Sequence, residues 1–150
     1  MDRRNLLLAF IVVVVGGGLL IGFASVPGGW YGELRKPFFN PPNWVFAPIW
    51  LVLYVAIAIA GWRVFTRGNV RAAMALWTVQ LALNFLWPPV FFRAHRIDAA
   101  LVVIGVLLVI LLALIAVVWN RDRASGLLLL PYAVWVAFAA WLNAAIWRLN

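Results

Sequence analysis

The chain has 150 residues, of which 67% are hydrophobic and only 11% are charged. A soluble globular domain carries about 25% charged residues, so this composition excludes an ordinary water-exposed surface. The formal net charge is +8, but the basic residues stand at the ends of apolar runs, where they can reach lipid head groups. No nucleic-acid partner is therefore expected. The sequence has no cysteine, which excludes disulfides and cysteine-ligated metals.

Five apolar runs are long enough to cross a bilayer, which requires roughly 20 mainly apolar residues. They use most of the chain and leave no room for a soluble enzymatic module. The sequence therefore predicts an all-α membrane protein, a five-transmembrane-helix bundle in which residues 1–150 form a single transmembrane domain. The runs cover about 5–26, 44–65, 72–92, 98–119 and 126–147.

The first run follows Arg3 and Arg4, so a cleaved signal peptide is one interpretation. The run is longer than the roughly 7–15 apolar residues of a signal peptide, and a retained helix is favoured. Gly18 and Gly22 form a GxxxG pattern, which permits close approach of a neighbouring helix. That neighbour is either another helix of the same bundle or a second copy of the chain.

The segment 27–43 is the only long loop, and its four prolines and three glycines exclude a continuous helix. It also carries Trp30, Tyr31, Phe38 and Phe39, although a disordered linker is normally poor in aromatic residues. We expect a folded cap over one mouth of the bundle. The alternative is that these aromatic side chains simply anchor the loop at the membrane interface.

The remaining connections are short, so the helices that they join should run antiparallel. The third run ends in Trp87-Pro88-Pro89, where the prolines should bend or stop the helix. The run 98–119 is aliphatic and is expected to act as scaffold. Seven of the twelve basic residues fall on the side of the N-terminus, which mildly favours a cytoplasmic N-terminus.

Polar side chains within the runs are few, and such groups in lipid indicate either function or interhelical packing. Helical spacing places the amides beside aromatic residues on three helix faces. These faces carry Phe46, Trp50 and Tyr54; Trp77, Gln80, Asn84, Trp87 and Phe91; and Tyr132, Trp135, Ala139 and Asn143.

Two interpretations of these faces stay open. The amides can be interhelical hydrogen bonds in a packed core, worth about 0.6 kcal/mol each. Alternatively, the three faces enclose a cavity for a large planar apolar molecule. The runs hold no buried acid, lysine or histidine to carry a proton, which argues against a proton-coupled antiporter. His95 is the only histidine and stands in a short loop, so neither a metal site nor a resident cofactor is expected.

Several ordered motifs extend along nearly the whole chain. They are Trp30-Tyr31, Lys36-Pro37, residues 40–50 with Tyr54, residues 80–84, residues 87–92, Pro131-Tyr132, Trp135 and Leu142-Asn143. In this order and spacing they resemble the translocator protein (TspO/MBR) family, also called tryptophan-rich sensory protein or peripheral-type benzodiazepine receptor. The chain is similar to the bacterial members of that family.

The resemblance implies a five-helix bundle, commonly a homodimer, whose first loop caps a ligand pocket. In the family this pocket receives porphyrins, notably protoporphyrin, and synthetic drugs of the benzodiazepine-receptor class; some members also bind cholesterol. Carried over by position, the pocket residues are Tyr31, Trp50, Asn84, Trp87, Trp135 and Ala139. The polar and aromatic helix faces add Phe46, Tyr54, Gln80 and Asn143 as ligand-binding candidates.

Three functions are compatible with this resemblance. The first is a receptor or transporter for porphyrins with a regulatory role in tetrapyrrole metabolism. The second is an enzyme that degrades protoporphyrin with light and oxygen, since Trp50 and Trp135 match tryptophans implicated in some bacterial members. The third is a sterol-binding or purely sensory protein. Residues 142–148 lack the tyrosine of the mammalian sterol motif. The expected location is a membrane of the bacterial cell envelope.

Overall fold

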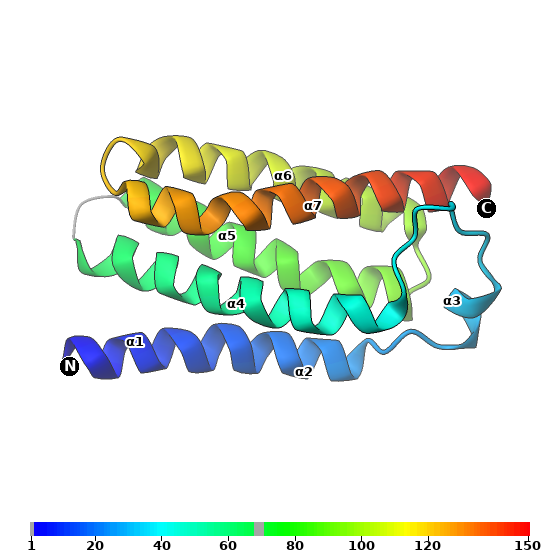
Figure 1. The fold of residues 1–150 in the computed structure, drawn as a ribbon, viewed down its shortest axis with the longest axis horizontal. Helices are drawn as coiled ribbons and strands as arrows, with labels where there is room; N and C mark the ends of the chain where they lie inside the picture. The colour runs from blue at the N-terminus through cyan, green and yellow to red at the C-terminus, as the bar shows by residue number, and fades with distance from the viewer. Residues whose placement is uncertain (1, 68–70) are drawn as a thin grey trace.

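The structure is a computed structural model that describes residues 2–67 and 71–150. Over that part of the chain it is a helical bundle without strands (Figure 1). The first span is a continuous rod in which a π-helical turn joins two α-helices. The elements are α1 (Arg3–Ile11), η1 (Val12–Gly16), α2 (Gly17–Ala24), α3 (Gly29–Glu33), α4 (Asn43–Thr66), α5 (Arg71–Pro88), η2 (Pro89–Arg93), α6 (Ile97–Trp119) and α7 (Arg123–Leu149).

Five helical segments within the described residues are long and apolar enough to cross a membrane. The shortest has 22 residues, which at 1.5 Å per residue gives a rod of about 33 Å, enough for a hydrocarbon core of about 30 Å. The five predicted runs are thereby confirmed, and the protein is a multi-pass integral membrane protein. The spans are Arg3–Ala24, Asn43–Thr66, Arg71–Arg93, Ile97–Trp119 and Arg123–Leu149.

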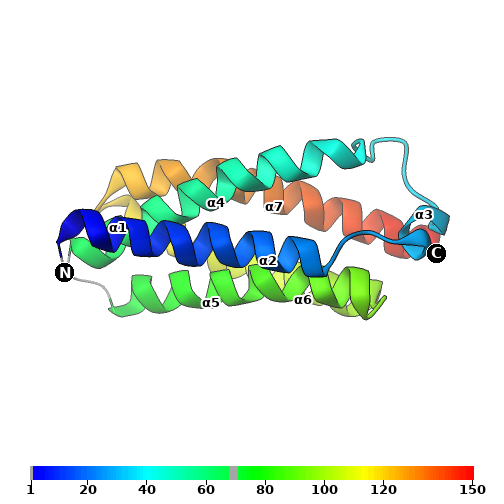
Figure 2. The ribbon, with the colours of Figure 1, turned by 90° about the horizontal axis from the view of Figure 1, so that it is seen from below.

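Successive spans run antiparallel, and the two termini lie at opposite ends of the bundle (Figure 1). α7 packs against α4 and α6, and α5 packs against α6. The first span changes partner along its length, because α1 packs on α4 whereas α2 packs on α5. α2 and α4 accordingly separate toward the end of the bundle that carries α3 (Figure 2).

The third span does not stop at Pro88 and Pro89. These residues have no N–H, so the helical hydrogen-bond ladder loses two donors there. The chain continues as the π-helical turn η2, in which the N–H of Ala94 donates to the carbonyl of Pro89 at 2.9 Å. The following loop turns at His95, whose φ is 55°. The prolines thus change the type of helix rather than end it.

Residues 25–42, hereafter the lid, fold back over one end of the bundle. The side chain of Tyr31 in α3 is only 6% exposed and packs edge-on against Phe91. Farther along the lid, the ring of Phe39 stacks on Trp141 of α7 with 4.2 Å between ring centroids. The predicted folded cap is therefore confirmed.

Two further contacts hold the lid. The backbone N–H of Arg35 donates to Oδ1 of Asn150 at 3.0 Å, and Nδ2 of Asn150 donates to the carbonyl of Arg35 at 2.9 Å. Trp30 stacks on His95 with 4.1 Å between ring centroids. By contrast, Phe38 at the outer turn of the lid is fully exposed, so interfacial anchoring by that residue stays a prediction.

The opposite end of the bundle is fastened by an ion pair between α4 and the residue that precedes α7. Nε and Nη2 of Arg63 donate to the two carboxylate oxygens of Asp122 at 2.9 and 2.7 Å. The hydroxyl of Ser125 donates to Oδ2 of the same carboxylate at 2.6 Å. The hydrogen-bonded guanidinium of Arg63 holds the pKa of Asp122 down to about 2.

Candidate functional site

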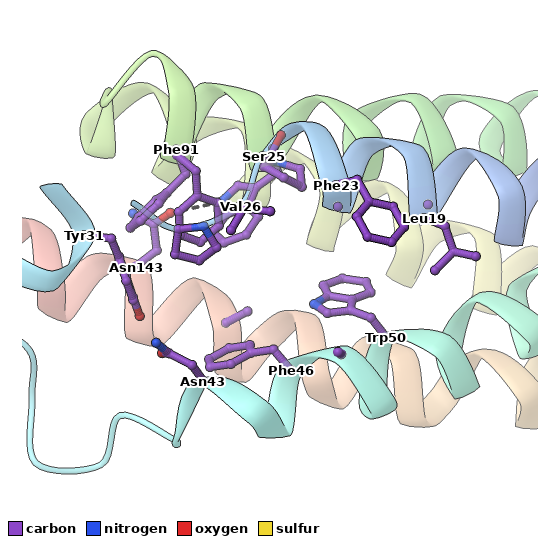
Figure 3. A pocket seen from close by; sticks show the side chains of 18 of the residues that line it. Leu19, Phe23, Ser25, Val26, Tyr31, Asn43, Phe46, Trp50, Phe91 and Asn143 are labelled. Atoms are coloured by element: carbon purple, nitrogen blue, oxygen red, sulfur yellow. Dashed lines mark hydrogen bonds between the residues drawn. The ribbon is translucent and has the colours of Figure 1, made fainter. Parts of the chain in front are cut away.

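A cavity of about 550 Å³ lies under the lid (Figure 3). This volume falls within the range of about 300–1,000 Å³ that is typical of small-molecule pockets. None of the described residues that line it is an acid, lysine, arginine or histidine. The lining consists of Gly18, Leu19, Gly22, Phe23, Ser25, Val26, Pro27, Tyr31, Asn43, Phe46, Ala47, Trp50, Leu51, Tyr54, Trp87, Pro88, Phe91, Phe92, Ala139, Leu142, Asn143 and Ile146.

One wall is the aromatic face of α4. Phe46, Trp50 and Tyr54 are four residues apart, which places them on one face of a helix, and all three line the cavity. The rings of Trp50 and Tyr54 are stacked with 5.4 Å between centroids. Figure 3 shows Trp50 and Phe46 projecting from α4 into the cavity. This wall offers flat polarisable surfaces to a planar ligand.

The wall near the lid combines the aromatic ring of Trp87 with the amide of Asn143. Nε1 of Trp87 donates to Oδ1 of Asn143 at 3.0 Å, and Nδ2 of Asn143 donates to the carbonyl of Ile97 at 3.0 Å. The indole N–H and both ends of the amide are therefore engaged within the protein, which fixes the indole plane of Trp87. Ala139, one turn before Asn143, leaves space because its side chain is small.

Asn84 and Gln80 do not line the cavity; they lie behind its α4 wall in a buried network. The hydroxyl of Tyr54 donates to Oδ1 of Asn84 at 3.1 Å, and Nδ2 of Asn84 donates to the hydroxyl of Tyr132 at 2.8 Å. Tyr132 in turn donates to Oε1 of Gln80 at 2.8 Å. The two amides thus hold tyrosines in place, and direct ligand contact by them stays a prediction.

Trp135 also lies outside the lining. It is half-buried and packs against Phe46, with 5.7 Å between ring centroids. Its indole Nε1 is buried and has no hydrogen-bond partner within the described structure. Phe46 therefore stands between Trp135 and the cavity. A role of Trp135 in binding or chemistry stays a prediction.

The sequence argument missed the contribution of the first span. Leu19, Gly22 and Phe23 of this span line the cavity, but in the sequence residues 6–24 are uniformly apolar and show no amide or tryptophan to mark a ligand-facing side. The one available signal was the GxxxG pattern. Gly18 meets the ring of Tyr54 within the same chain, so this half of the pattern serves packing inside the bundle; a homodimer stays a prediction.

The cavity can bind, stack and orient, but its side chains offer little acid–base chemistry. Over residues 2–67 and 71–150, no three His, Cys, Asp or Glu side chains gather where they could hold a metal ion. The oxidisable groups that face the cavity are indoles and phenols. Any reaction there would depend on the electronic properties of the ligand itself.

The sequence of the chain matches a protein-family model. The model described as the TspO/MBR family matches residues 9–148, which include the lid, the three middle spans and most of the first and last spans. The chain belongs to the TspO/MBR family. The segments that carried the resemblance, residues 40–50 and 87–92 among them, supply much of the TspO/MBR cavity lining described above.

Individual TspO/MBR relatives cover most of the chain as well. It is 41% identical to Protein CrtK of Rhodobacter capsulatus over 83% of this chain and 80% of that protein. It is 37% identical to the tryptophan-rich sensory protein of Cereibacter sphaeroides, over 90% of this chain and 85% of that one. It is 39% identical to the translocator protein of Sus scrofa, over 81% of this chain and 75% of that one.

Proposed function

We propose that this protein is a membrane receptor or transporter that binds a porphyrin such as protoporphyrin in the cavity under the lid, with a regulatory role in tetrapyrrole metabolism. The observation that carries the proposal is the aromatic, uncharged lining of a 550 Å³ cavity formed by four spans and the lid. The names of its relatives, sensory and translocator proteins, are consistent with a role in sensing or transport.

The binding mode follows from the lining. A porphyrin is flat and largely apolar, so its ring gains most from stacking on an indole such as Trp50 and from edge contacts with Phe46. Among the described residues, the lining offers no histidine or carboxylate to ligate a central metal, which favours the metal-free ring. Drugs of the benzodiazepine-receptor class and sterols are apolar enough to compete for the same space, and we treat them as competitors.

Titration of the purified protein with protoporphyrin tests the proposal. Tryptophan fluorescence should be quenched saturably, and Trp50→Ala should raise the dissociation constant about tenfold, equivalent to about 1.4 kcal/mol. Trp147→Phe is the control, because Trp147 is exposed and does not line the cavity. Non-saturable quenching, equal in all three proteins, contradicts the proposal. Porphyrin flux into sealed vesicles separates a transporter from a receptor that only binds.

The second candidate function is light- and oxygen-dependent degradation of protoporphyrin. It is favoured by Trp50, which lines the cavity, and by Trp135, which lies one ring behind it next to Phe46. A photoexcited porphyrin can take an electron from a nearby indole. The porphyrin radical that results then reacts with dioxygen. Light-driven bleaching should therefore slow in Trp50→Phe and Trp135→Phe. Unchanged bleaching in both variants excludes this activity.

A further inference from the structure

The wall of the cavity is incomplete between α2 and α4. Phe23 and Val26 line the cavity, yet their side chains are 79% and 64% exposed. Leu19 on α2 and Leu51 on α4 show the same combination of lining and exposure. A side chain that both faces an internal space and touches the outside stands at an opening. These four residues define the α2–α4 slot.

The slot results from the change of partner along the first span. At Gly18 the span still touches α4, where it meets the ring of Tyr54. One helical turn nearer to the lid, a β-carbon placed on Gly22 would meet nothing within 4 Å. From that point α2 packs on α5 and separates from α4 (Figure 2). The slot therefore begins on the lid side of Gly18 and widens toward the lid.

The slot opens into lipid rather than water. Three of its four residues belong to membrane spans, Leu19 and Phe23 to Arg3–Ala24 and Leu51 to Asn43–Thr66, and Val26 lies two residues beyond the end of the first span. Residues 5–24 and 43–62 contain no charged residue, and Figure 3 shows Leu19 and Phe23 projecting from α2 toward Trp50 on α4. A surface without charged residues is typical of a helix face that contacts the hydrocarbon of the bilayer.

The route from water, by contrast, is obstructed by the lid. Tyr31 is buried against Phe91, and the lid is fastened at Phe39 and Arg35 by the contacts with Trp141 and Asn150. A large planar molecule could pass there only if several of these contacts broke together. The slot needs no such rearrangement, because exposed aliphatic and aromatic side chains at its rim can change rotamer rapidly.

We infer that the ligand reaches the cavity sideways from the hydrocarbon layer of the bilayer, through the α2–α4 slot, and not from water past the lid. This inference rests on the proposed function, since it requires that the cavity binds a ligand. It restricts the ligand class to molecules that partition into membranes before they bind. It also assigns Phe23 a specific role as the side chain at the rim of the slot.

Single-cysteine labelling tests the route, because the chain contains no cysteine of its own. Phe23→Cys is reconstituted in phosphatidylcholine vesicles and labelled with maleimides of small and large volume. Val102→Cys on α6, also exposed and near the lid end, is the control. Phe38→Cys, fully exposed on the lid, places the same labels on the water side. Protoporphyrin association and dissociation are then followed by tryptophan fluorescence.

Compared with the small label at the same residue, a bulky label at residue 23 should slow both association and dissociation, roughly tenfold or more. The reason is that an obstructed route raises the barrier in both directions. Labels at residues 38 and 102 should leave both rates unchanged. The inference is overturned if only the label at residue 38 slows the exchange, or if the label at residue 23 changes the dissociation constant without a common change in rates.

Other outcomes are equally decisive. If the maleimide modifies Val102→Cys but cannot reach the thiol of Phe23→Cys in the bilayer, another surface, such as a second copy of the chain, covers the slot and the inference is wrong. If the unlabelled protein fails to bind protoporphyrin, the proposed function itself fails. If the unlabelled protein binds and the label at residue 23 has no effect on either rate, only the lateral route fails.

Discussion

The ring of Tyr54 lies directly against Gly18 of the first span, so closely that a β-carbon at residue 18 would overlap the ring. This contact marks the end of the cavity that is farthest from the lid. Tyr54 lines the cavity from α4 and also donates a hydrogen bond to Asn84, which lies behind Tyr54. Gly18 thus allows the first span to approach α4 closely at the level of Tyr54.

Gly18→Ala should destabilise the protein by about 1–3 kcal/mol, because the added methyl group must displace a phenol that is held by Asn84. Thermal unfolding in detergent, followed by circular dichroism, measures the loss. Gly16→Ala is the matched control, since a β-carbon at residue 16 meets nothing within 4 Å. Equal melting temperatures for the two variants would contradict the close contact.

The five spans, the lid and the α4 face could be predicted from the sequence, because each depends on local features. Span length follows from apolar runs, and Phe46, Trp50 and Tyr54 share a helix face at any depth. The placement of Trp135 could not be predicted in this way. Three residues advance a helix by about 300°, so Trp135 lies about 60° to one side of Tyr132, and only the packing of α7 decides whether that edge reaches the cavity.

The sequence also could not predict how far along each span the cavity extends. Gln80 and Asn84 share a helix face with Trp87, and the prediction treated all three as lining residues. The cavity ends near Tyr54, however, so only Trp87 reaches it and the amides fall in the packed layer below. Likewise, the lining role of Phe23 depends on the tilt of the first span away from α4, which is a tertiary property.

Gly22→Leu should weaken porphyrin binding at least about tenfold, or about 1.4 kcal/mol, because the new side chain enters space that the ligand would occupy. The fold should persist, since nothing lies within 4 Å of the added β-carbon. Gly105→Leu on α6 is the matched control, as it too is open but lines no part of the cavity. Fluorescence titration compares the two; equal affinities would show that the ligand binds elsewhere.

Asn84→Leu should lower stability by about 1–3 kcal/mol, because it leaves the buried hydroxyl of Tyr54 without its acceptor and removes the amide donor to Tyr132. Ligand affinity should fall as well, since Tyr54 lines the cavity and loses its orientation. Parallel thermal unfolding and porphyrin titration separate the two effects. Unchanged affinity would assign Asn84 a purely structural role.

Gln80→Leu is to be compared with Asn84→Leu, because both residues form a hydrogen bond with Tyr132. Gln80 accepts one hydrogen bond from Tyr132, but its Nε2 is buried without a partner within the described structure. The substitution removes an unsatisfied donor but leaves the buried hydroxyl of Tyr132 without its acceptor, so its net cost should stay below that of Asn84→Leu, which breaks two hydrogen bonds. A loss as large as that of Asn84→Leu would mean that Nε2 has a partner, such as a bound water molecule.

The pair between Arg63 and Asp122 predicts a specific acid sensitivity. Its contribution is fully present above the unfolded-state pKa of an aspartate, about 3.9, and is lost as the pH falls through the folded-state pKa of about 2. Asp122→Asn should cost about 1.5–3 kcal/mol at neutral pH, because Arg63 loses its ion pair and the amide nitrogen cannot accept one of the two charge-assisted hydrogen bonds. It should also flatten the pH dependence of the melting temperature between pH 4 and about 2.

Asp98→Asn is the control for that experiment. Asp98 and Arg96 form a similar bidentate pair, but both side chains are exposed to more than half of their surface. Solvent screens such a pair, so its loss should change stability much less than the loss of the Arg63–Asp122 pair. Melting temperatures of the wild type and both variants are measured from pH 6 to pH 2. If the melting temperature of Asp122→Asn falls in parallel with that of the wild type, the acid-sensitive group lies elsewhere in the bundle.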